Sequence, residues 1–244
     1  MRRLRDFTSA RVDLPTAGDS LATAPLLDLR LAQARARDAV HLELDPYSLQ
    51  RWPSLILRSQ AKTRDEYLRR PDLGRLLDSS SLSALSLLPA RSPYAFVIAD
   101  GLSALAVHRH AIPFLEIVFK NLNWHPDEYH PVFLVQQGRV AIGDELGEAI
   151  AADLSIILIG ERPGLSSPDS LGVYLTWSPR RGRTDAGRNC ISNIHANGLS
   201  YELAAHKLLF LIHEARRRKL SGVAIKETAG QLLSMKNEQG RLPE

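Results

Sequence analysis

The sequence predicts an α/β fold in which a mostly parallel sheet is flanked by helices and preceded by a small helical N-terminal subdomain. Two observations carry this prediction. After residue 90, apolar runs of strand length alternate with helical segments, which is typical of a parallel sheet covered on both faces. Before residue 90, the segments are rich in Leu, Ala and Arg and hold few β-branched residues, which favours helices.

The N-terminal part, residues 1–90, is expected to consist of one long helix and several short ones. Thr23 can cap a helix that continues through Val40, with Pro25 tolerated in its first turn. Pro71 ends one of the short helices, which are expected at 46–51, 64–70 and 79–88. On the long helix, apolar residues share one face and arginines occupy the rest: Leu27, Leu31 and Ala34 against Arg30, Arg35 and Arg37.

Residues 91–226 are predicted to form a Rossmann-like domain. Four apolar runs have the length of strands: Tyr94–Ala99, Val132–Gln136, Leu154–Ile159 and Val173–Trp177. Helical segments lie between and after them, at Ser103–Leu122, 142–151 and 201–219. Pro113 is expected to kink or interrupt the first of these helices. The polar residues 227–244 are expected to form a flexible tail.

Polar and glycine-bearing loops follow the first three strands of this domain, at 100–103, 138–140 and 160–172. In open α/β sheets, ligands bind outside the carboxyl ends of the strands, so these loops predict a ligand site, although ordinary turns have a similar composition. Glu161 and Arg162 follow a buried strand and precede Pro163-Gly164, which places them rigidly at the mouth of such a pocket. A salt-bridged loop is the structural alternative for this pair.

Composition excludes several classes of protein. The 244 residues are 44% hydrophobic and 24% charged, which excludes wholesale disorder. The longest apolar stretch, Ser92 to His108, is broken by Asp100 and is too short for a membrane span, and no secretory signal is expected. The single cysteine, Cys190, excludes an intramolecular disulfide and a cysteine-cluster metal site, and it fits a reducing cytosol.

The known signatures of several enzyme classes are absent from the sequence: G-x-G-x-x-G after the first strand, G-x-x-x-x-G-K-[ST] and G-x-S-x-G. His108 and His110 form an H-x-H pair, but residues two apart on a helix do not face each other, so a metal site is disfavoured. His206 and His213 are assigned to the surface because no carboxylate accompanies them at a metal spacing.

Two further groups of residues have both a functional and a structural interpretation. Cys190 with His195 could form a nucleophilic pair, but no third orienting group accompanies them, and a packed or ligand-contacting thiol is favoured. The basic runs 180–183 and 216–219 could bind nucleic acid, and the net charge is +4. No aromatic residues interleave with either run, so solvent or partner faces are favoured.

Seven blocks of the sequence resemble, in the same order, the small (light) subunit family of ethanolamine ammonia-lyase. The similarity covers about residues 8–225, and seven blocks in register are specific although each alone is weak. The blocks are Thr8-Ser-Ala-Arg11 followed by Gly18, Tyr67-Leu-Arg-Arg-Pro-Asp-Leu-Gly-Arg75, Val97-Ile-Ala-Asp-Gly-Leu-Ser103, Gly138-Arg-Val140, Ile142-Gly-Asp-Glu-Leu-Gly-Glu148, Ile159-Gly-Glu-Arg-Pro-Gly-Leu165 and Arg188-Asn-Cys-Ile-Ser-Asn-Ile194.

This resemblance implies one half of an adenosylcobalamin-dependent lyase that converts ethanolamine to acetaldehyde and ammonia by a radical mechanism. In the family, the substrate site and the radical chemistry belong to a large TIM-barrel subunit, and the small subunit closes over the cofactor without a catalytic residue of its own. The family's cofactor-binding positions carry over onto Val140 in Gly-Arg-Val, Glu161 in Gly-Glu-Arg-Pro-Gly and Cys190 in Asn-Cys-Ile-Ser-Asn.

Two further expectations come from comparison with related proteins. The chain lacks D-x-H-x-x-G, by which some cobalamin proteins replace the lower base with histidine, so base-on adenosylcobalamin is expected. Some family members carry a long N-terminal extension associated with bacterial microcompartments. Here seven residues precede the first block, so packaging into a microcompartment is disfavoured, while the cytoplasmic location that fits the single cysteine is still expected. A basic α/β nucleic-acid-binding module is the alternative hypothesis, and it rests on charge alone.

Overall fold

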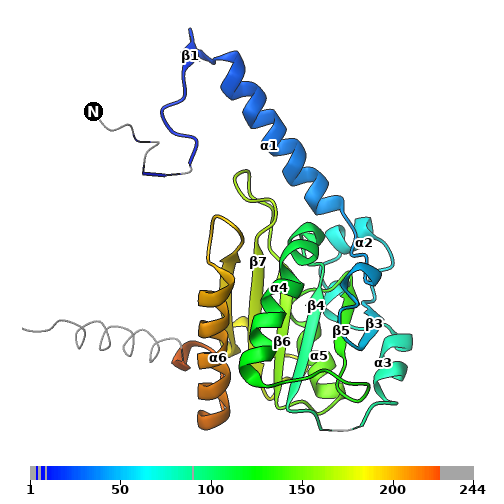
Figure 1. The fold of residues 1–244 in the computed structure, drawn as a ribbon. Helices are drawn as coiled ribbons and strands as arrows, with labels where there is room; N and C mark the ends of the chain where they lie inside the picture. Colours follow the sequence, from blue (N-terminus) through cyan, green and yellow to red (C-terminus); the bar gives the residue numbers. More distant parts are fainter. Residues whose placement is uncertain (1–3, 5–6, 9, 90, 226–244) are drawn as a thin grey trace, which may run out of the picture.

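The computed structural model describes residues 4, 7–8, 10–89 and 91–225. Its body is a six-stranded sheet of order β3-β5-β4-β6-β7-β8, with helices on both faces (Figure 1). Strands β3 to β6 are mutually parallel, whereas β7 is antiparallel to β6 and β8 is antiparallel to β7. The predicted mostly parallel sheet flanked by helices is confirmed. The strands are β3 Ser54–Arg58, β4 Tyr94–Ala99, β5 Val132–Gln136, β6 Leu154–Gly160, β7 Leu171–Trp177 and β8 Arg188–Ile194.

Two apolar clusters hold the sheet between its helices. The central strands β4, β5 and β6 are buried almost throughout, because α4 and α6 pack on one face and α5 packs on the other. Because helices cover both faces of the sheet, the side chains on both faces of these parallel strands are apolar. The α-helices are α1 Thr23–His41, α2 Arg64–Arg69, α3 Ser79–Leu85, α4 Ala104–Leu122, α5 Ile142–Ala149 and α6 Tyr201–Arg218. Short 3₁₀ turns lie at Tyr47–Leu49, Leu73–Arg75 and Asp185–Gly187, and a small hairpin is formed by β1 Thr16–Ala17 and β2 Ser20–Leu21.

The part before residue 90 differs from the prediction in two respects. It contains a strand, β3, which follows Pro53 and pairs in parallel with β5 at the edge of the main sheet. The division of the chain at residue 90 stays a prediction, but this part is not helical throughout. In addition, Ala22 is the N-cap of α1 and forms no side-chain cap, so the predicted cap at Thr23 is wrong.

In the second part, the predicted strands are confirmed, and β8 is an addition. Helix α4 starts after Ser103, whose hydroxyl accepts a hydrogen bond from the Ala106 amide. It continues through Pro113, so the expected interruption does not occur, because buried side chains on both sides of Pro113 fix the helix against the sheet. The predicted tail at 227–244 lies outside the described residues.

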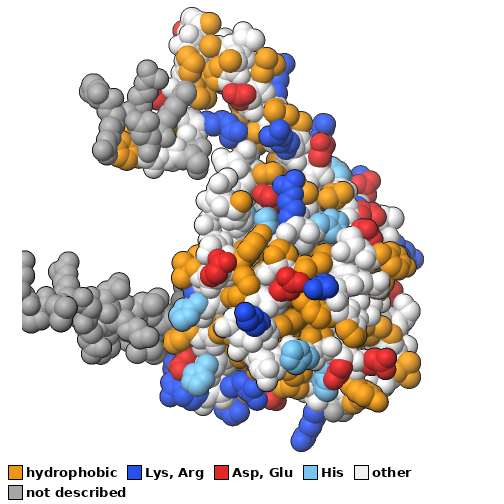
Figure 2. Space-filling view, in the orientation of Figure 1, with side chains coloured by type: hydrophobic (Ala, Val, Ile, Leu, Met, Phe, Trp, Pro, Cys, Tyr) orange, Lys and Arg blue, Asp and Glu red, His pale blue; other side chains and the backbone are white. Residues whose placement is uncertain are grey.

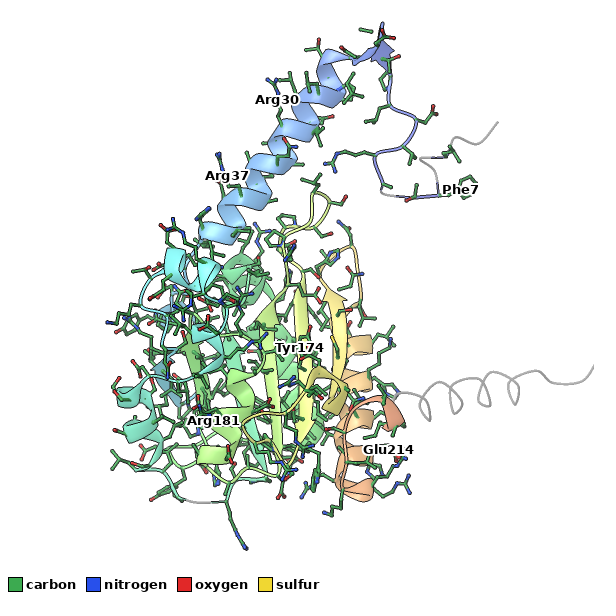
Figure 3. The ribbon with its side chains drawn as sticks, turned by 180° about the vertical axis from the view of Figure 1, so that it is seen from behind. Phe7, Arg30, Arg37, Tyr174, Arg181 and Glu214 are labelled. Atoms are coloured by element: carbon green, nitrogen blue, oxygen red, sulfur yellow. The ribbon has the colours of Figure 1, made fainter. Side chains whose placement is uncertain are left out.

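Helix α1 projects from the body as an arm (Figure 1). Its C-terminal end is joined to the body, since Arg64 Nε donates to the Val40 carbonyl at 2.7 Å. Further out, Leu27 and Leu31 are 57% and 50% exposed, so the predicted apolar face does not pack on the sheet. Figure 2 shows hydrophobic and basic side chains along this arm, and Figure 3 shows Arg30 and Arg37 projecting from it. Among the described residues, no helix is long and apolar enough to cross a bilayer.

Candidate functional site

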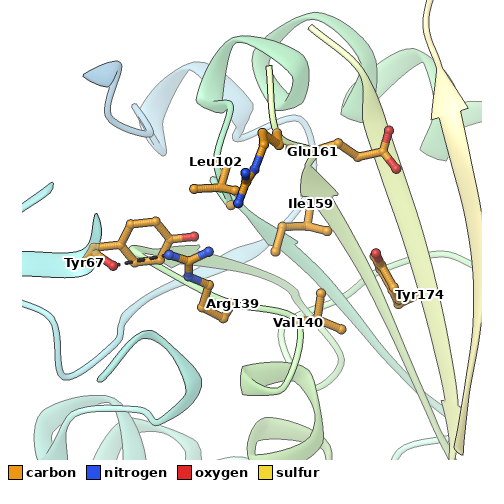
Figure 4. Close-up of a pocket in the computed structure, with 10 residues that line it drawn as sticks. Tyr67, Leu102, Arg139, Val140, Ile159, Glu161 and Tyr174 are labelled. Carbon is orange, nitrogen blue, oxygen red and sulfur yellow. Dashed lines mark hydrogen bonds between the residues drawn. The ribbon is translucent and has the colours of Figure 1, made fainter. Parts of the chain in front are cut away.

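A pocket of about 310 Å³ lies where β4 and β6 end and the loop after β5 begins. The three loops that the sequence places at this edge all contribute to it, together with α2 and the middle of β7 (Figure 4). Its walls are partly apolar and partly charged. The lining residues are Tyr67, Gly101, Leu102, Arg139, Val140, Ile159, Gly160, Glu161, Arg162 and Tyr174.

Glu161 follows β6 directly, and hydrogen bonds on one side fix its carboxylate. The Oε2 atom accepts a hydrogen bond from the Ser170 hydroxyl and another, at 3.1 Å, from the backbone amide of Asn193 near the end of β8. The Glu161 amide donates to the Ser170 carbonyl at 2.9 Å, which closes the base of the loop. No hydrogen bond to Oε1 is found within the described part of the chain, and no ion pair there joins Glu161 to Arg162. The salt-bridged alternative for this pair is therefore not what the structure shows.

Val140 lies on the opposite wall, at the start of α5. It is half-buried and packs against the apolar cluster beneath α5, so its position is set by the core. Val140 and Glu161 line the same pocket although 20 other residues separate them in the chain. The structure thus brings two of the three predicted binding residues into one site.

Cys190 lies beside this pocket, in strand β8 and not in a loop. It is exposed, and its cross-strand neighbour is Tyr174, which lines the pocket (Figure 4). The thiol and the Tyr174 hydroxyl interact, and burial, followed by the nearness of Cys190, raises the pKa of Tyr174 above its usual value. Tyr174 therefore stays protonated at neutral pH. It connects Cys190 to the pocket that Val140 and Glu161 line.

Tyr67 and Arg139 form the remaining wall as a stacked pair (Figure 4). The Arg139 guanidinium carbon lies 4.2 Å from the centre of the Tyr67 ring, and Nη2 donates to the Tyr67 carbonyl at 3.3 Å. The Tyr67 hydroxyl donates to the Gly138 carbonyl at 3.1 Å. The Arg139 Nε is buried without a hydrogen-bond partner within the described chain. One wall therefore contains a fixed cation, with a buried donor that no described group accepts from.

Asp100 anchors the loops beneath the pocket. Its carboxylate accepts from the Gln137 and Gly138 amides, both at 2.9 Å, and pairs with Arg64 at 3.4 Å. Complete burial raises the pKa of this carboxyl to about 6, although Arg64 and the amides lower it. The next residue must be glycine, because Gly101 has a φ of +57° and a Cβ there would lie 2.3 Å from the Gly160 carbonyl oxygen.

Comparison with known proteins decides the family. The family model of the ethanolamine ammonia-lyase light chain matches residues 1–226. The chain belongs to this family. It is 53% identical over 236 residues to an ethanolamine ammonia-lyase small subunit from Ralstonia nicotianae, which covers 93% of this chain and 87% of the relative. Relatives with the same name from Pseudomonas paraeruginosa and Azotobacter vinelandii are 54% and 52% identical over 236 and 238 residues; each alignment covers 93% of this chain, and 86% and 88% of the respective relative.

The two histidines of the H-x-H pair have structural partners, as the sequence indicates. His108 Nε2 accepts from the Asp45 amide at 3.0 Å, whereas His110 contacts Tyr201 and Asp169, so the two rings serve different segments. His206 and His213 are exposed, as predicted. Among the residues that the structure describes, no three His, Cys, Asp or Glu side chains gather as a metal ion would require.

The proposed Cys190–His195 pair does not form a nucleophilic site. His195 is buried, and both of its ring nitrogens are used: Nδ1 accepts from the Asn197 amide at 3.3 Å, and Nε2 lies 2.9 Å from the Asn193 side-chain oxygen. Because neither nitrogen is available to take a proton from a thiol, Cys190 has no base in this residue.

The basic runs are largely occupied by contacts within the light chain. In the second run, Arg217 pairs with Glu214, Arg216 donates to the Tyr94 hydroxyl at 2.9 Å, and Lys219 lies 4.7 Å from the centre of the Trp177 ring. In the first run, Arg181 pairs with Glu145 at 3.5 Å. These contacts favour the structural interpretation over nucleic-acid binding.

Sequence reasoning missed several residues that line the pocket. The position of Arg162 after a strand reveals it in the sequence. The stacked pair Tyr67 and Arg139, and Tyr174, the cross-strand neighbour of Cys190, are not revealed in this way. Tyr67 and Arg139 do lie within blocks shared with the family, and that was the available signal. Tyr174 has no local signal, because its side of β7 depends on the antiparallel pairing with β6.

Proposed function

We propose that this chain is the small subunit of an adenosylcobalamin-dependent ethanolamine ammonia-lyase and that it holds the cofactor against a large subunit. The observation that supports this function is the gathering of Val140, Glu161 and Cys190, from three distant segments, around one pocket edge. The relatives are named small subunits, so we infer a hetero-oligomer with a large subunit. From the resemblance we infer that this partner is a TIM barrel, and from the single cysteine we infer a cytoplasmic location.

The pocket residues fit the edge of a corrinoid. Corrin carries peripheral amides, whose N–H groups need acceptors and whose carbonyls need donors. Glu161 Oε1 is such an acceptor, the Arg139 Nε is a buried donor without a partner, and Val140 supplies an apolar surface. A pocket of about 310 Å³ takes only part of so large a group, so the remainder lies against another chain.

Among the described residues no histidine lines the pocket, and the proposal that the cofactor keeps its own lower base rests on the missing D-x-H-x-x-G motif. When bound, adenosylcobalamin supplies the reaction with an organic radical through cleavage of its cobalt–carbon bond. In this proposal, the residues of this chain contribute by binding the cofactor and by excluding water. Conversion of ethanolamine to acetaldehyde and ammonia belongs, in this proposal, to the large subunit.

Substitution of Glu161 tests the proposal. In lyase reconstituted with the large subunit, Glu161→Ala is expected to weaken cyanocobalamin binding about three- to tenfold, because a hydrogen bond contributes about 0.5–1.5 kcal/mol. Absorption titration of the purified complex measures this. Glu128→Ala is the matched control, since Glu128 is an exposed carboxylate in the loop that precedes β5, at the amino ends of the parallel strands and thus away from the pocket. Unchanged affinity in Glu161→Ala, or full ethanolamine lyase activity from the large subunit alone, would contradict the proposed function.

A further inference from the structure

The loop that carries Glu161, residues 161–170, is held at three places by other segments of the chain. We refer to it as the Glu161 loop. The Arg11 guanidinium donates to the Leu165 carbonyl at 3.3 Å, and the Ser103 hydroxyl donates to the Pro168 carbonyl at 2.8 Å. The third contact is to the Asp169 side chain, and it is the most elaborate of the three. A ten-residue connection with this many tethers is held in place rather than free to move.

Asp169 ends a chain of side-chain hydrogen bonds that crosses from the Glu161 loop to helices α4 and α6. Its Oδ2 accepts from Arg109 Nη1 at 2.9 Å and lies 3.3 Å from His110 Nε2. His110 Nδ1 lies 2.6 Å from the Tyr201 hydroxyl. The His110 side chain is 6% exposed and that of Asp169 is 18% exposed, so these contacts are largely shielded from water.

The protonation states within this chain of hydrogen bonds follow from its members. Arg109 and His110 hold the pKa of Asp169 below its usual value against the effect of burial, so Asp169 is an acceptor at neutral pH. Burial lowers the pKa of His110 and raises that of Tyr201, so the ring is neutral and the phenol is protonated. Nε2–H therefore donates to Asp169, and the Tyr201 hydroxyl donates to Nδ1. Both ring nitrogens of His110 and the Tyr201 hydroxyl proton are thus engaged, which fixes the orientation of the His110 ring.

This hydrogen-bonded chain is linked to the Glu161 carboxylate through the residue that follows Asp169. Asp169 is followed by Ser170, and Ser170 both donates its hydroxyl to Glu161 Oε2 and accepts the Glu161 amide through its carbonyl. The second support of Oε2 is the Asn193 amide. On the β7 side the carboxylate lies close to Gly172, where an added Cβ would lie 3.1 Å from Oε1. The position of the carboxylate thus depends on where Ser170 and Asn193 are held.

We propose that Asp169 and His110 are positioning residues, which hold Ser170 and through it orient the Glu161 carboxylate toward a corrinoid amide. Neither side chain lines the pocket, so neither contacts the cofactor itself. This inference rests on the proposed function, because it assumes that Glu161 accepts a hydrogen bond from a bound cofactor. It predicts that the effect of losing Asp169 on the cofactor is transmitted through Glu161 alone.

A double-mutant cycle tests this dependence. In the reconstituted lyase, with cyanocobalamin as the probe, Asp169→Ala is expected to weaken binding about threefold or more, which corresponds to the loss of roughly one hydrogen bond to Glu161. In the Glu161→Ala background, Asp169→Ala is expected to cause no further loss. Asp169→Asn, which keeps an acceptor for Arg109 and His110, is expected to restore most of the affinity. Asp127→Ala is the control, since Asp127 also binds a histidine, His130, but lies in the loop that precedes β5.

Three outcomes overturn the inference. The first is unchanged affinity in Asp169→Ala, and the second is an equal loss from Asp169→Ala with and without Glu161. The third is hydrogen exchange at the Glu161 amide that does not accelerate in Asp169→Ala, since that amide is bonded to the Ser170 carbonyl. Failure of the proposed function gives a different result: Glu161→Ala alone then leaves the affinity for cyanocobalamin unchanged. Asp169→Asn preserves the shape of the side chain, so it replaces Asp169→Ala in the cycle if the alanine variant does not fold, and a loss of affinity that is equal with and without Glu161 counts against the inference.

Discussion

At the scale of single residues, the buried carboxylate of Asp100 is the group whose protonation links the stability of the fold to pH. Burial raises its pKa to about 6, and the hydrogen bonds from Gln137 and Gly138 with the charge of Arg64 do not reverse this. The folded chain therefore binds this proton more tightly than the unfolded chain, in which an aspartate has a pKa of about 3.9. The contribution of Asp100 to stability is largest below pH of about 4 and falls as the pH rises toward 6.

We expect the Asp100→Asn variant to lose this pH dependence. Between pH 4 and 6.5, the free energy of unfolding of the unsubstituted chain should fall relative to that of the variant by up to about 3 kcal/mol, at about 1.4 kcal/mol per unit of pKa shift. Urea unfolding of both chains at several pH values measures the difference, in which the other titrating groups cancel. A loss of stability in Asp100→Asn that is the same at every pH would contradict the raised pKa.

The residues of the candidate site differ in how far the sequence reveals them. Val140 and Glu161 could be placed at a common edge because each follows an apolar run, and the carboxyl ends of parallel strands meet. Cys190 could be connected to them only by resemblance, since its strand is polar and exposed on one side. Tyr174 and Asp169 could not be found, because their roles depend on pairing between β6 and β7 and on contacts between distant segments.

At the scale of elements, the same distinction explains which strands were predicted. The buried central strands are apolar runs whose bounds can be read directly from the sequence. The edge strand β3 has only three apolar residues between Ser54 and Arg58, and β8 carries Arg, Asn and Ser, so local propensity does not separate them from loops. Helix α4 shows the opposite case, in which tertiary packing keeps a helix intact through Pro113.

The start of α4 gives a prediction at this scale. The buried Ser103 hydroxyl both accepts from the Ala106 amide and donates to the Pro168 carbonyl. Ser103→Ala should therefore lower the free energy of unfolding by about 2 kcal/mol, from one cap and one further hydrogen bond. The control is Ser200→Ala at the start of α6, where an exposed hydroxyl forms the cap alone and about 1 kcal/mol should be lost. Equal losses in urea unfolding would show that the bond to Pro168 contributes nothing.

At the scale of the whole molecule, the least self-sufficient part is the arm formed by α1. An amphipathic helix gains most of its stability from packing, yet Leu27 and Leu31 of this helix are exposed, and Val40, which binds the body, lies near its C-terminal end. The arm leaves the body on the side of the candidate site, since Arg64 connects its end to Asp100 and Arg11 connects the preceding segment to the Glu161 loop. If a large subunit covers the cofactor there, the arm lies within its reach.

We therefore expect substitutions on the arm to weaken assembly and to leave the folding of the chain unchanged. The double substitution Leu27→Glu and Leu31→Glu should reduce the amount of this chain that co-purifies with a tagged large subunit, because two apolar side chains, each contributing about 1.5–3 kcal/mol when fully buried, are replaced by charges. The control is Leu87→Glu, a leucine that is 86% exposed in the connection before β4, at the other edge of the sheet. Since Leu27 and Leu31 contribute little to the core of the body, the thermal unfolding of the variant should match that of the unsubstituted chain. Co-purification that falls equally in all variants, or in none, would show that the arm is not where the large subunit binds.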